Sequence, residues 1–346
     1  MTVILLGLFA LDILIVVTQC APSDCYRHPD ILSMHTCLAN YFAKKDTLTA
    51  NEWQQMLPTA TERSQYNQLI SGILSAKDAS VCSQNLLSQY PEIADDIEVR
   101  YYQKSYCIIA ESKLHPTKNI FRRSWGYVII ADDTWSKLNV YHSAPHFQSD
   151  LHTDIEAVMI FNMTRSRAVA INGASRFAVQ DGVKSPCITE YYAADASHDN
   201  RTMFFVANSA MLAHQGASCP HEHCAFIQWH GMAAGSCPDA NVFVSTGISN
   251  SHNTYSLPGL PANKIVAAFN QLGMGVAKTP KESICNLVAA ENVFGRLING
   301  VTTANVCKTA AASSGVTGKF VHIEQEPSVR AEFEKWTQII NSAFPL

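Results

Sequence analysis

The stretch GYVIIADDTWSKLNVYHSAPHFQSD, residues 126–150, decides the fold class of this 346-residue chain. Two short apolar runs, 126–131 and 138–141, read as strands, and residues 150–161 follow with apolar positions at helical spacing. Strand-like and helical runs keep alternating from there to the end of the chain. The further strands are expected at 167–171, 225–229, 242–246 and 320–324, and the further helices at 199–212, 261–272 and 328–343. This alternation predicts an α/β domain over residues 120–346, with a mostly parallel mixed sheet flanked by helices.

The preceding region, residues 21–119, shows few strand signals. Ile31, Met34 and Leu38 recur at helical spacing, and a capping box at Thr49 opens a further helix. We expect a small helical, disulfide-bearing region ahead of the α/β domain. Three roles are open to it, in this order of preference: a cap on the main domain, a binding module, or a removable pro-segment.

A dibasic pair, Arg122-Arg123, suggests proteolytic processing between the two regions. The residues directly after it, 125–130, read as a strand. Cleavage at the pair would therefore fall against a core strand, which is an argument against processing.

The first 20 residues are expected to be a secretory signal. Their apolar run, 3–17, is shorter than the roughly 20 residues that span a bilayer, and small residues precede Ala21 as at a cleavage site. Ten cysteines remain after Cys20, an even number without repeated CxxC pairs, which indicates a disulfide framework in an oxidising compartment. The sequons at Asn162 and Asn200 fit a glycoprotein. We expect a secreted protein with no stable membrane anchor.

Composition excludes other classes of function. The chain is 47% hydrophobic and 16% charged, as expected for a globular protein. It has 25 Lys plus Arg against 29 Asp plus Glu, so no basic surplus is present to bind nucleic acid. No Gly-x-Ser-x-Gly motif occurs, which disfavours a serine hydrolase.

Groups that bind metals follow three of the expected strands. His146 and Asp150 come after the strand at 138–141, His230 follows the strand at 225–229, and Glu324 ends the last strand. Ligands in open α/β sheets bind at the carboxyl ends of strands, so these side chains are expected to meet. Two imidazoles, a carboxylate and a further glutamate make a hydrolytic zinc site with a general base.

Each of these residues also has a structural interpretation. His146 could be a loop histidine, Asp150 a helix N-cap and His230 a packed residue at a strand end. A second histidine pair, His221 and His223, lies on one face of an extended segment. Three cysteines crowd around that pair, which favours a disulfide-pinned surface loop over a metal site.

The ordered set of motifs resembles zinc-dependent carboxypeptidase-like hydrolases, and in particular the N-formylglutamate amidohydrolase and poly-gamma-glutamate hydrolase groups. The resemblance covers roughly residues 120–346 and leaves the helical region aside. It is carried by Trp125-Gly, Pro145-His146-Phe-Gln-Ser-Asp150, Asn172-Gly-Ala-Ser-Arg176, Asp195-Ala-Ser-His198, Gln228-Trp-His230-Gly and Phe320-Val-His-Ile-Glu324-Gln.

The resemblance implies a role for each matched position. His146, Asp150 and His230 would bind Zn²⁺, and Glu324 would take a proton from the attacking water and then protonate the leaving amine. The family pattern places a Glu three residues after the His. This chain has an Asp four residues on, so Glu156 is the alternative second ligand.

Three further residues have open roles. Arg176 is expected either to clamp a substrate carboxylate or to form a structural salt bridge, and Arg296 is a second candidate clamp that could instead anchor a helix end. Glu326 competes with Glu324 as the base. The expected function is that of a secreted zinc hydrolase cleaving an amide or peptide bond near a free carboxylate, in a small peptide or amide substrate. The alternative is a catalytically silent secreted binding protein on a hydrolase fold.

Overall fold

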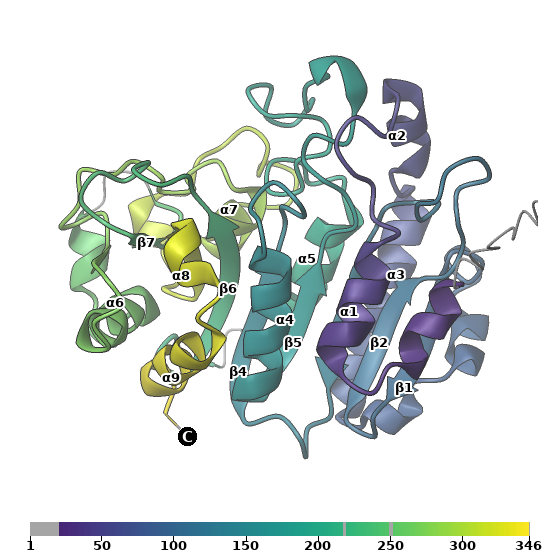
Figure 1. The fold of residues 1–346 in the computed structure, drawn as a ribbon, viewed down its shortest axis with the longest axis horizontal. Coiled ribbons are helices and arrows are strands. Elements are labelled where there is room, and N and C mark those ends of the chain that lie inside the picture. The colour runs from purple at the N-terminus through teal and green to yellow at the C-terminus, as the bar shows by residue number, and fades with distance from the viewer. Residues whose placement is uncertain (1–20, 217–218, 249–251, 346) are drawn as a thin grey trace, which may run out of the picture.

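The computed structural model describes residues 21–216, 219–248 and 252–345. The expected signal segment, 1–20, lies outside the described residues. The described chain forms a nine-stranded sheet with the order β1-β2-β3-β5-β4-β6-β9-β7-β8 (Figure 1). The strands are β1 (Ile97–Tyr102), β2 (Tyr106–Glu111), β3 (Tyr127–Ala131), β4 (Leu138–Ala144), β5 (Ser166–Ile171), β6 (Cys224–Gly231), β7 (Val242–Ser245), β8 (Ala277–Lys278) and β9 (Phe320–Gln325).

The sheet is mixed. Its four central strands, β5-β4-β6-β9, run parallel to one another, whereas β1, β2 and β3 extend one side as an antiparallel meander and β7 pairs antiparallel with β9. The carboxyl ends of four parallel strands therefore meet at one edge. This confirms the α/β fold class expected from the sequence.

Helices cover both faces of the sheet, because its strands are apolar on both faces. In β2, Ile108 belongs to one core and Ile109 to the other, as strand alternation requires. Helices α1 (Ile31–Ala39), α4 (Thr153–Thr164), α6 (Pro261–Gln271) and α9 (Phe333–Ala343) lie over one face, and Figure 1 shows α1, α4 and α9 in front of the strands. The other face is covered by α3 (Ala60–Ala76), α5 (Met203–Gln215) and α7 (Val293–Ile298), while α2 (Ala50–Met56) and α8 (Pro327–Arg330) are short.

The region 21–119 holds the expected helices and also two strands that the sequence analysis missed. Strands β1 and β2 form a hairpin, and β2 pairs with β3, so the sheet continues across residue 120. The hairpin turn is made by Gln103 and Lys104, both with positive φ (50° and 55°). Such turns usually carry Asn-Gly, and the absence of that pair removed the strongest hairpin signal.

The dibasic pair joins the N-terminal helices to the sheet. Arg123 forms ion pairs with Glu62 of α3 at 2.6 Å and with Asp96 at 2.9 Å, and Arg122 reaches Asp96 as well. The indole of Trp125 donates to the carbonyl of Met56. The two arginines therefore occupy a structural network at the start of β3.

All ten cysteines from Cys25 onward are paired, which confirms the expected disulfide framework. The pairs are Cys25–Cys37, Cys82–Cys107, Cys187–Cys307, Cys219–Cys224 and Cys237–Cys285. Such a framework indicates an extracellular or otherwise oxidising environment. Within the described residues, every helix is too short or too polar to cross a membrane.

Candidate metal centre

Three of the expected ligands meet at the carboxyl edge of the parallel strands. His146 follows β4, Asp150 lies at the end of the same loop, and His230 is the penultimate residue of β6. The Nδ1 atoms of His146 and His230 are 3.1 Å apart, and Asp150 Oδ2 lies 2.9 Å from the first and 3.4 Å from the second. All three side chains are buried.

These separations match those of ligands around one small cation. Zinc–ligand bonds of about 2.0–2.1 Å in a tetrahedral site place neighbouring donor atoms roughly 3.3–3.4 Å apart. The separation of 3.4 Å between His230 and Asp150 matches that value, and the other two, 2.9 and 3.1 Å, are slightly shorter. The three donors could therefore hold a metal ion with small adjustments of their side chains.

The second nitrogen of each imidazole is bonded to a fixed oxygen. His146 Nε2 lies 2.9 Å from Asp195 Oδ1, and His230 Nε2 lies 2.9 Å from Gln228 Oε1, which also accepts from the amide of Asn292. Both oxygens act as acceptors, so each ring carries its proton on Nε2 and turns the Nδ1 lone pair toward the other. This is the arrangement of metal-ligating histidines with outer-shell partners.

Protonation of one ring would be the other way to satisfy the two facing nitrogens. Burial would lower the pKa of His146, but Asp150 and Asp195 raise it above its usual value, so without a metal ion His146 can donate from Nδ1 to Asp150. Burial lowers the pKa of His230 to about 4, although its hydrogen bond to Asp150 acts in the opposite direction. Burial by itself would raise the pKa of Asp150, yet His146, His230 and Arg176 hold it well below its ordinary range. A neutral His230 and an ionised Asp150 form a donor set suited to a divalent cation.

Arg176 lies directly beside the ligands. Its guanidinium contacts His146 Nδ1 and donates to Asp150 Oδ1 at 2.6 Å. The side chain is partly exposed and lines the cavity above the metal centre. Arg176 therefore forms a salt bridge with Asp150, which is the structural alternative expected for it, and it does so at the edge of the cavity where a substrate carboxylate could also reach it.

Arg296 lies elsewhere. Its guanidinium donates to the carbonyl oxygens of Ala290 and Val306, both at 2.8 Å, and it does not line the cavity. Arg296 anchors a helix end to the adjoining loop, which is the structural role that the sequence also allowed.

Glu324 reaches the cavity from β9. It is paired in register with His230 of β6, and its carboxylate lies 3.5 Å from His322 Nε2. Burial, followed by the charge of Asp150, raises the pKa of Glu324 to about 8. A carboxyl group with a pKa in this range can both accept and donate a proton near neutral pH.

The two competing carboxylates are engaged elsewhere. Glu326 accepts from the backbone N–H of Gly235 and from the amide of Asn241, each at 2.8 Å. Glu156 is fully buried in α4 and accepts from Gln325 Nε2 at 2.7 Å. Neither belongs to a group of possible metal ligands among the described residues.

The pair His221 and His223 also belongs to no such group in the described part of the chain. His221 Nε2 lies 2.9 Å from the carbonyl of Pro258, and the adjoining Cys219–Cys224 disulfide closes the segment. This agrees with the disulfide-pinned loop that the sequence favoured.

Four polar residues of the site could not be given a definite role from the sequence. Asp195 contacts both His146 and His198, the latter at 3.0 Å, His322 lines the cavity, and Gln228 bonds the ligand His230. His322 precedes Glu324 by two residues, and Gln228 precedes His230 by two. The period of two along a strand is the signal that would have placed them at the site.

Two loops of the site are held by the N-terminal region. We call residues 42–48 the N-terminal strap. Its backbone bonds at Ala43, Asp46 and Leu48 run alongside residues 173–180, the segment that carries Arg176. Lys45 N–H donates to the side chain of Gln148 in the metal-binding loop.

The strap also packs against the metal-binding loop. The ring of Phe42 meets Phe147, next to His146, edge to face at 5.0 Å between centroids. Asn172 ties the two loops together by donating to the carbonyls of Pro145 and Ala174. The N-terminal region therefore contacts both loops that carry site residues.

The glycine after His230 leaves room for the side chain of Arg330. The N–H of Gly231 donates to Asp150 Oδ2 at 3.1 Å, and a Cβ at this position would lie 2.3 Å from the guanidinium carbon of Arg330. Any larger residue would displace Arg330 or pull β6 away from Asp150.

The metal centre opens into a cavity of about 560 Å³. The ligand histidines, Arg176, His322 and Glu324 form part of its lining, and residues 286–292 form another wall together with Tyr191, Ser197 and His198. The volume suits a small molecule or the end of a peptide. Fold and site together define an α/β protein with a candidate metal centre at the carboxyl edge of its parallel strands.

Comparison with known proteins gives only weak structural similarity. No protein-family model and no curated protein matches the chain. Among solved structures, a bacteriophage poly-gamma-glutamate hydrolase is similar with a TM-score of 0.33 and 14% identity, over 60% of this chain and 84% of that one. A gene product of Agrobacterium tumefaciens is similar with a TM-score of 0.31 and 12% identity, over 60% and 86% of the two chains. The function proposed below therefore rests on the geometry of the metal centre.

Proposed function

We propose that the protein is a secreted zinc-dependent hydrolase that cleaves an amide or peptide bond near a free carboxylate. The single observation that carries the proposal is the pair of facing Nδ1 atoms of His146 and His230, 3.1 Å apart beside Asp150. Two imidazoles and one carboxylate are a better ligand set for zinc than for magnesium or calcium, because those two ions prefer oxygen ligands throughout.

Each residue has a task in this reaction. His146, Asp150 and His230 would hold the zinc ion, which when bound supplies Lewis-acid polarisation of the scissile carbonyl. Glu324 takes the proton of the attacking water and passes it to the departing amine nitrogen. Asp195 and Gln228 keep the two imidazoles in the ligating tautomer.

Arg176 would bind the substrate carboxylate. Its guanidinium already lies at the ligands and is partly exposed to the cavity, so rotation of the side chain would turn its donors to a bound anion. The planar fork of an arginine binds a carboxylate in a bidentate way. Small peptides or amides with a free carboxylate are the substrate class that this placement favours.

A matched pair of substrates tests the proposal. We expect the zinc-loaded protein to hydrolyse N-benzoylglycyl-L-phenylalanine and to be at least tenfold less active on its C-terminal amide, since a bidentate arginine–carboxylate contact is lost. Chelation should abolish the activity and added zinc should restore it. Activity that persists in full after chelation would rule out the zinc mechanism, and equal rates on the pair would rule out the carboxylate preference.

One observation favours the second candidate, a catalytically silent binding protein. The guanidinium of Arg176 already brings a positive charge to His146 and Asp150, which could substitute for a metal ion. In that case the purified protein would bind no zinc, and Arg176→Ala would destabilise it by leaving Asp150 without its cation.

A further inference from the structure

A carboxylate on the cavity wall forms no direct ion pair with the described cations, although the charge of Arg296 interacts with it at longer range. Glu291 lies in the 286–292 wall, and its Oε2 accepts a hydrogen bond of 2.7 Å from the hydroxyl of Tyr191. Glu291 takes part in none of the ion pairs formed among the described residues. Arg296, five residues on, directs its guanidinium to the carbonyls of Ala290 and Val306 instead. Glu291 thus presents a negative charge that a ligand could neutralise.

The Tyr191–Glu291 pair is fixed relative to the metal centre. The ring of Tyr191 stacks on that of His198 with centroids 3.4 Å apart and planes at 2°. His198 contacts Asp195, which in turn bonds the ligand His146. A continuous set of side-chain contacts therefore links Glu291 to the metal ligand.

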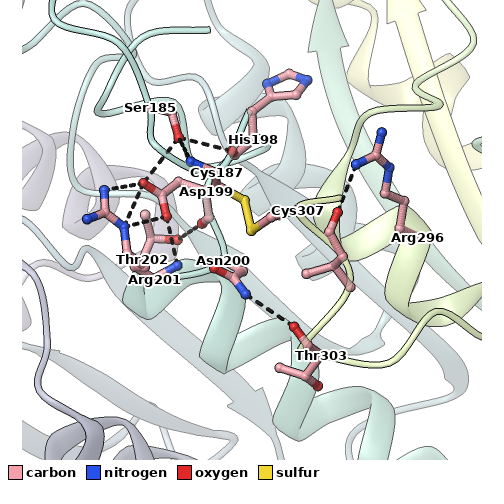
Figure 2. The surroundings of a disulfide bond; sticks show 11 residues. Ser185, Cys187, His198, Asp199, Asn200, Arg201, Thr202, Arg296, Thr303 and Cys307 are labelled. Carbon is pink, nitrogen blue, oxygen red and sulfur yellow. Dashed lines mark hydrogen bonds and ion pairs between the residues drawn. A yellow bond between two sulfur atoms is a disulfide. The ribbon is translucent and has the colours of Figure 1, made fainter. Parts of the chain in front are cut away.

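A disulfide holds both walls in place. Figure 2 shows Cys187–Cys307 joining the segment that carries His198 to the loop that Arg296 fixes through Val306. On the same side, the Ser185 hydroxyl donates to the carbonyl of His198 at 3.3 Å. The wall is thus cross-linked and its polar groups are preorganised, which lowers the entropic cost of binding a ligand.

A buried hydroxyl beside the same cavity has no hydrogen-bond partner among the described residues. Ser197 lines the cavity and is 1% exposed, and its Oγ forms no hydrogen bond. Its N–H is used, since it donates to Asp195 Oδ1 at 3.1 Å, which fixes the backbone beneath the hydroxyl. An unpaired buried hydroxyl costs free energy, so a ligand that reached this Oγ would gain a hydrogen bond without displacing a protein partner.

We propose that Glu291, Tyr191 and Ser197 form a subsite for an ammonium group of the substrate. An alkylammonium carries three N–H donors, and the subsite offers a carboxylate and two hydroxyl oxygens as acceptors. Tyr191 gives its own proton to Glu291, so its oxygen lone pairs stay available. The inference rests on the proposed function, because it assigns the substrate of that same cavity: a dipolar peptide with an amino group at Glu291 and a carboxylate at Arg176. A polyanionic substrate would be repelled by Glu291.

Two compounds that differ only by an amino group test the subsite: L-phenylalanylglycine and 3-phenylpropanoylglycine. We measure kcat/KM for both with the zinc-loaded protein, and their Kd by calorimetry with the same preparation. We expect the compound with the amino group to be preferred about tenfold, and Glu291→Gln, which keeps the acceptor for Tyr191 but removes the charge, to abolish the preference. Glu334→Gln on the exposed face of α9 is the matched control and should retain it.

The two proposals fail in different ways. If neither compound is hydrolysed but the Kd preference is present and is lost in Glu291→Gln, the ammonium subsite is supported and the hydrolase proposal fails. If both compounds bind or react equally well, or if Glu291→Gln keeps the preference, the subsite is wrong whether or not the protein is a hydrolase.

Discussion

His146 and His230 turn their Nδ1 atoms toward each other at 3.1 Å, with Asp150 between them. A neutral imidazole has one N–H, so a ring that donates from Nε2 carries a lone pair on Nδ1. Here both N–H groups are already bonded on the far sides of the rings, to Asp195 and Gln228. The outer contacts thus fix the rings so that their lone pairs converge, which is the basis of the predictions that follow.

Glu324 should be the residue whose loss stops catalysis. Glu324→Gln keeps the shape of the side chain and removes the base, so we expect turnover to fall by about a hundredfold or more with the zinc content unchanged. Glu326→Gln is the matched control, because Glu326 is bonded to Gly235 and Asn241 away from the cavity. The reverse order of effects would make Glu326 the base.

The N-terminal strap should control metal affinity. Phe42→Leu removes the edge-to-face contact with Phe147 beside the ligand His146, and we expect zinc binding to weaken about tenfold, as for other outer-shell contacts. Phe269→Leu is the control: Phe269 is equally buried and packs on Trp336 of α9 rather than on a loop that carries a metal ligand. Both variants should lose some thermal stability. Equal zinc affinities in the two would show that the strap is only structural.

Acid should destabilise the metal-free protein through His142. This residue is fully buried in β4, accepts from Trp229 Nε1 at 3.1 Å and lies 2.9 Å from the Ser166 hydroxyl. Burial lowers its pKa to about 3, against about 6.5 in an unfolded chain. The unfolded state therefore binds the extra proton, so the stabilising effect is complete above pH 6.5 and is lost as the pH falls toward 3.

A non-titrating variant isolates this contribution. Between pH 7 and 4, the free energy of unfolding of the wild type should fall more steeply than that of His142→Gln, by on the order of 1.4 kcal/mol per pH unit. Urea denaturation in the presence of a chelator measures both slopes. Parallel slopes would mean that His142 is protonated in the folded protein or that the unfolded chain does not take up the proton.

Much of the site could be predicted from sequence because it lies on strand ends. Parallel strands bring their carboxyl ends to one edge, so a histidine or carboxylate just after an apolar run is placed by the fold itself. His146, Asp150, His230 and Glu324 meet this condition: the structure groups Asp150 with the two histidines, and the histidines and Glu324 line one cavity. Arg176 meets this condition less closely, because it lies five residues beyond the end of β5.

The rest of the fold and of the site depends on contacts that produce no periodic pattern in the sequence. Asp195 and Glu291 lie in loops without repeating apolar positions, and their places follow from the Cys187–Cys307 disulfide and from long-range hydrogen bonds. The strap pairs with residues about 130 positions away in the sequence. The β1–β2 hairpin was missed because Gln103 and Lys104 adopt a turn that Asn and Gly usually make.

Metal content is the most direct test of the account. The secreted protein, purified without chelators or added metal and analysed by plasma mass spectrometry, should contain one zinc ion per chain, and the folded His230→Ala variant should contain almost none. Absence of metal from the wild type, together with no zinc binding in a calorimetric titration, would contradict the proposed metal centre and favour the silent binding protein. Zinc at full stoichiometry in both His230→Ala and His146→Ala would place the metal elsewhere in the chain.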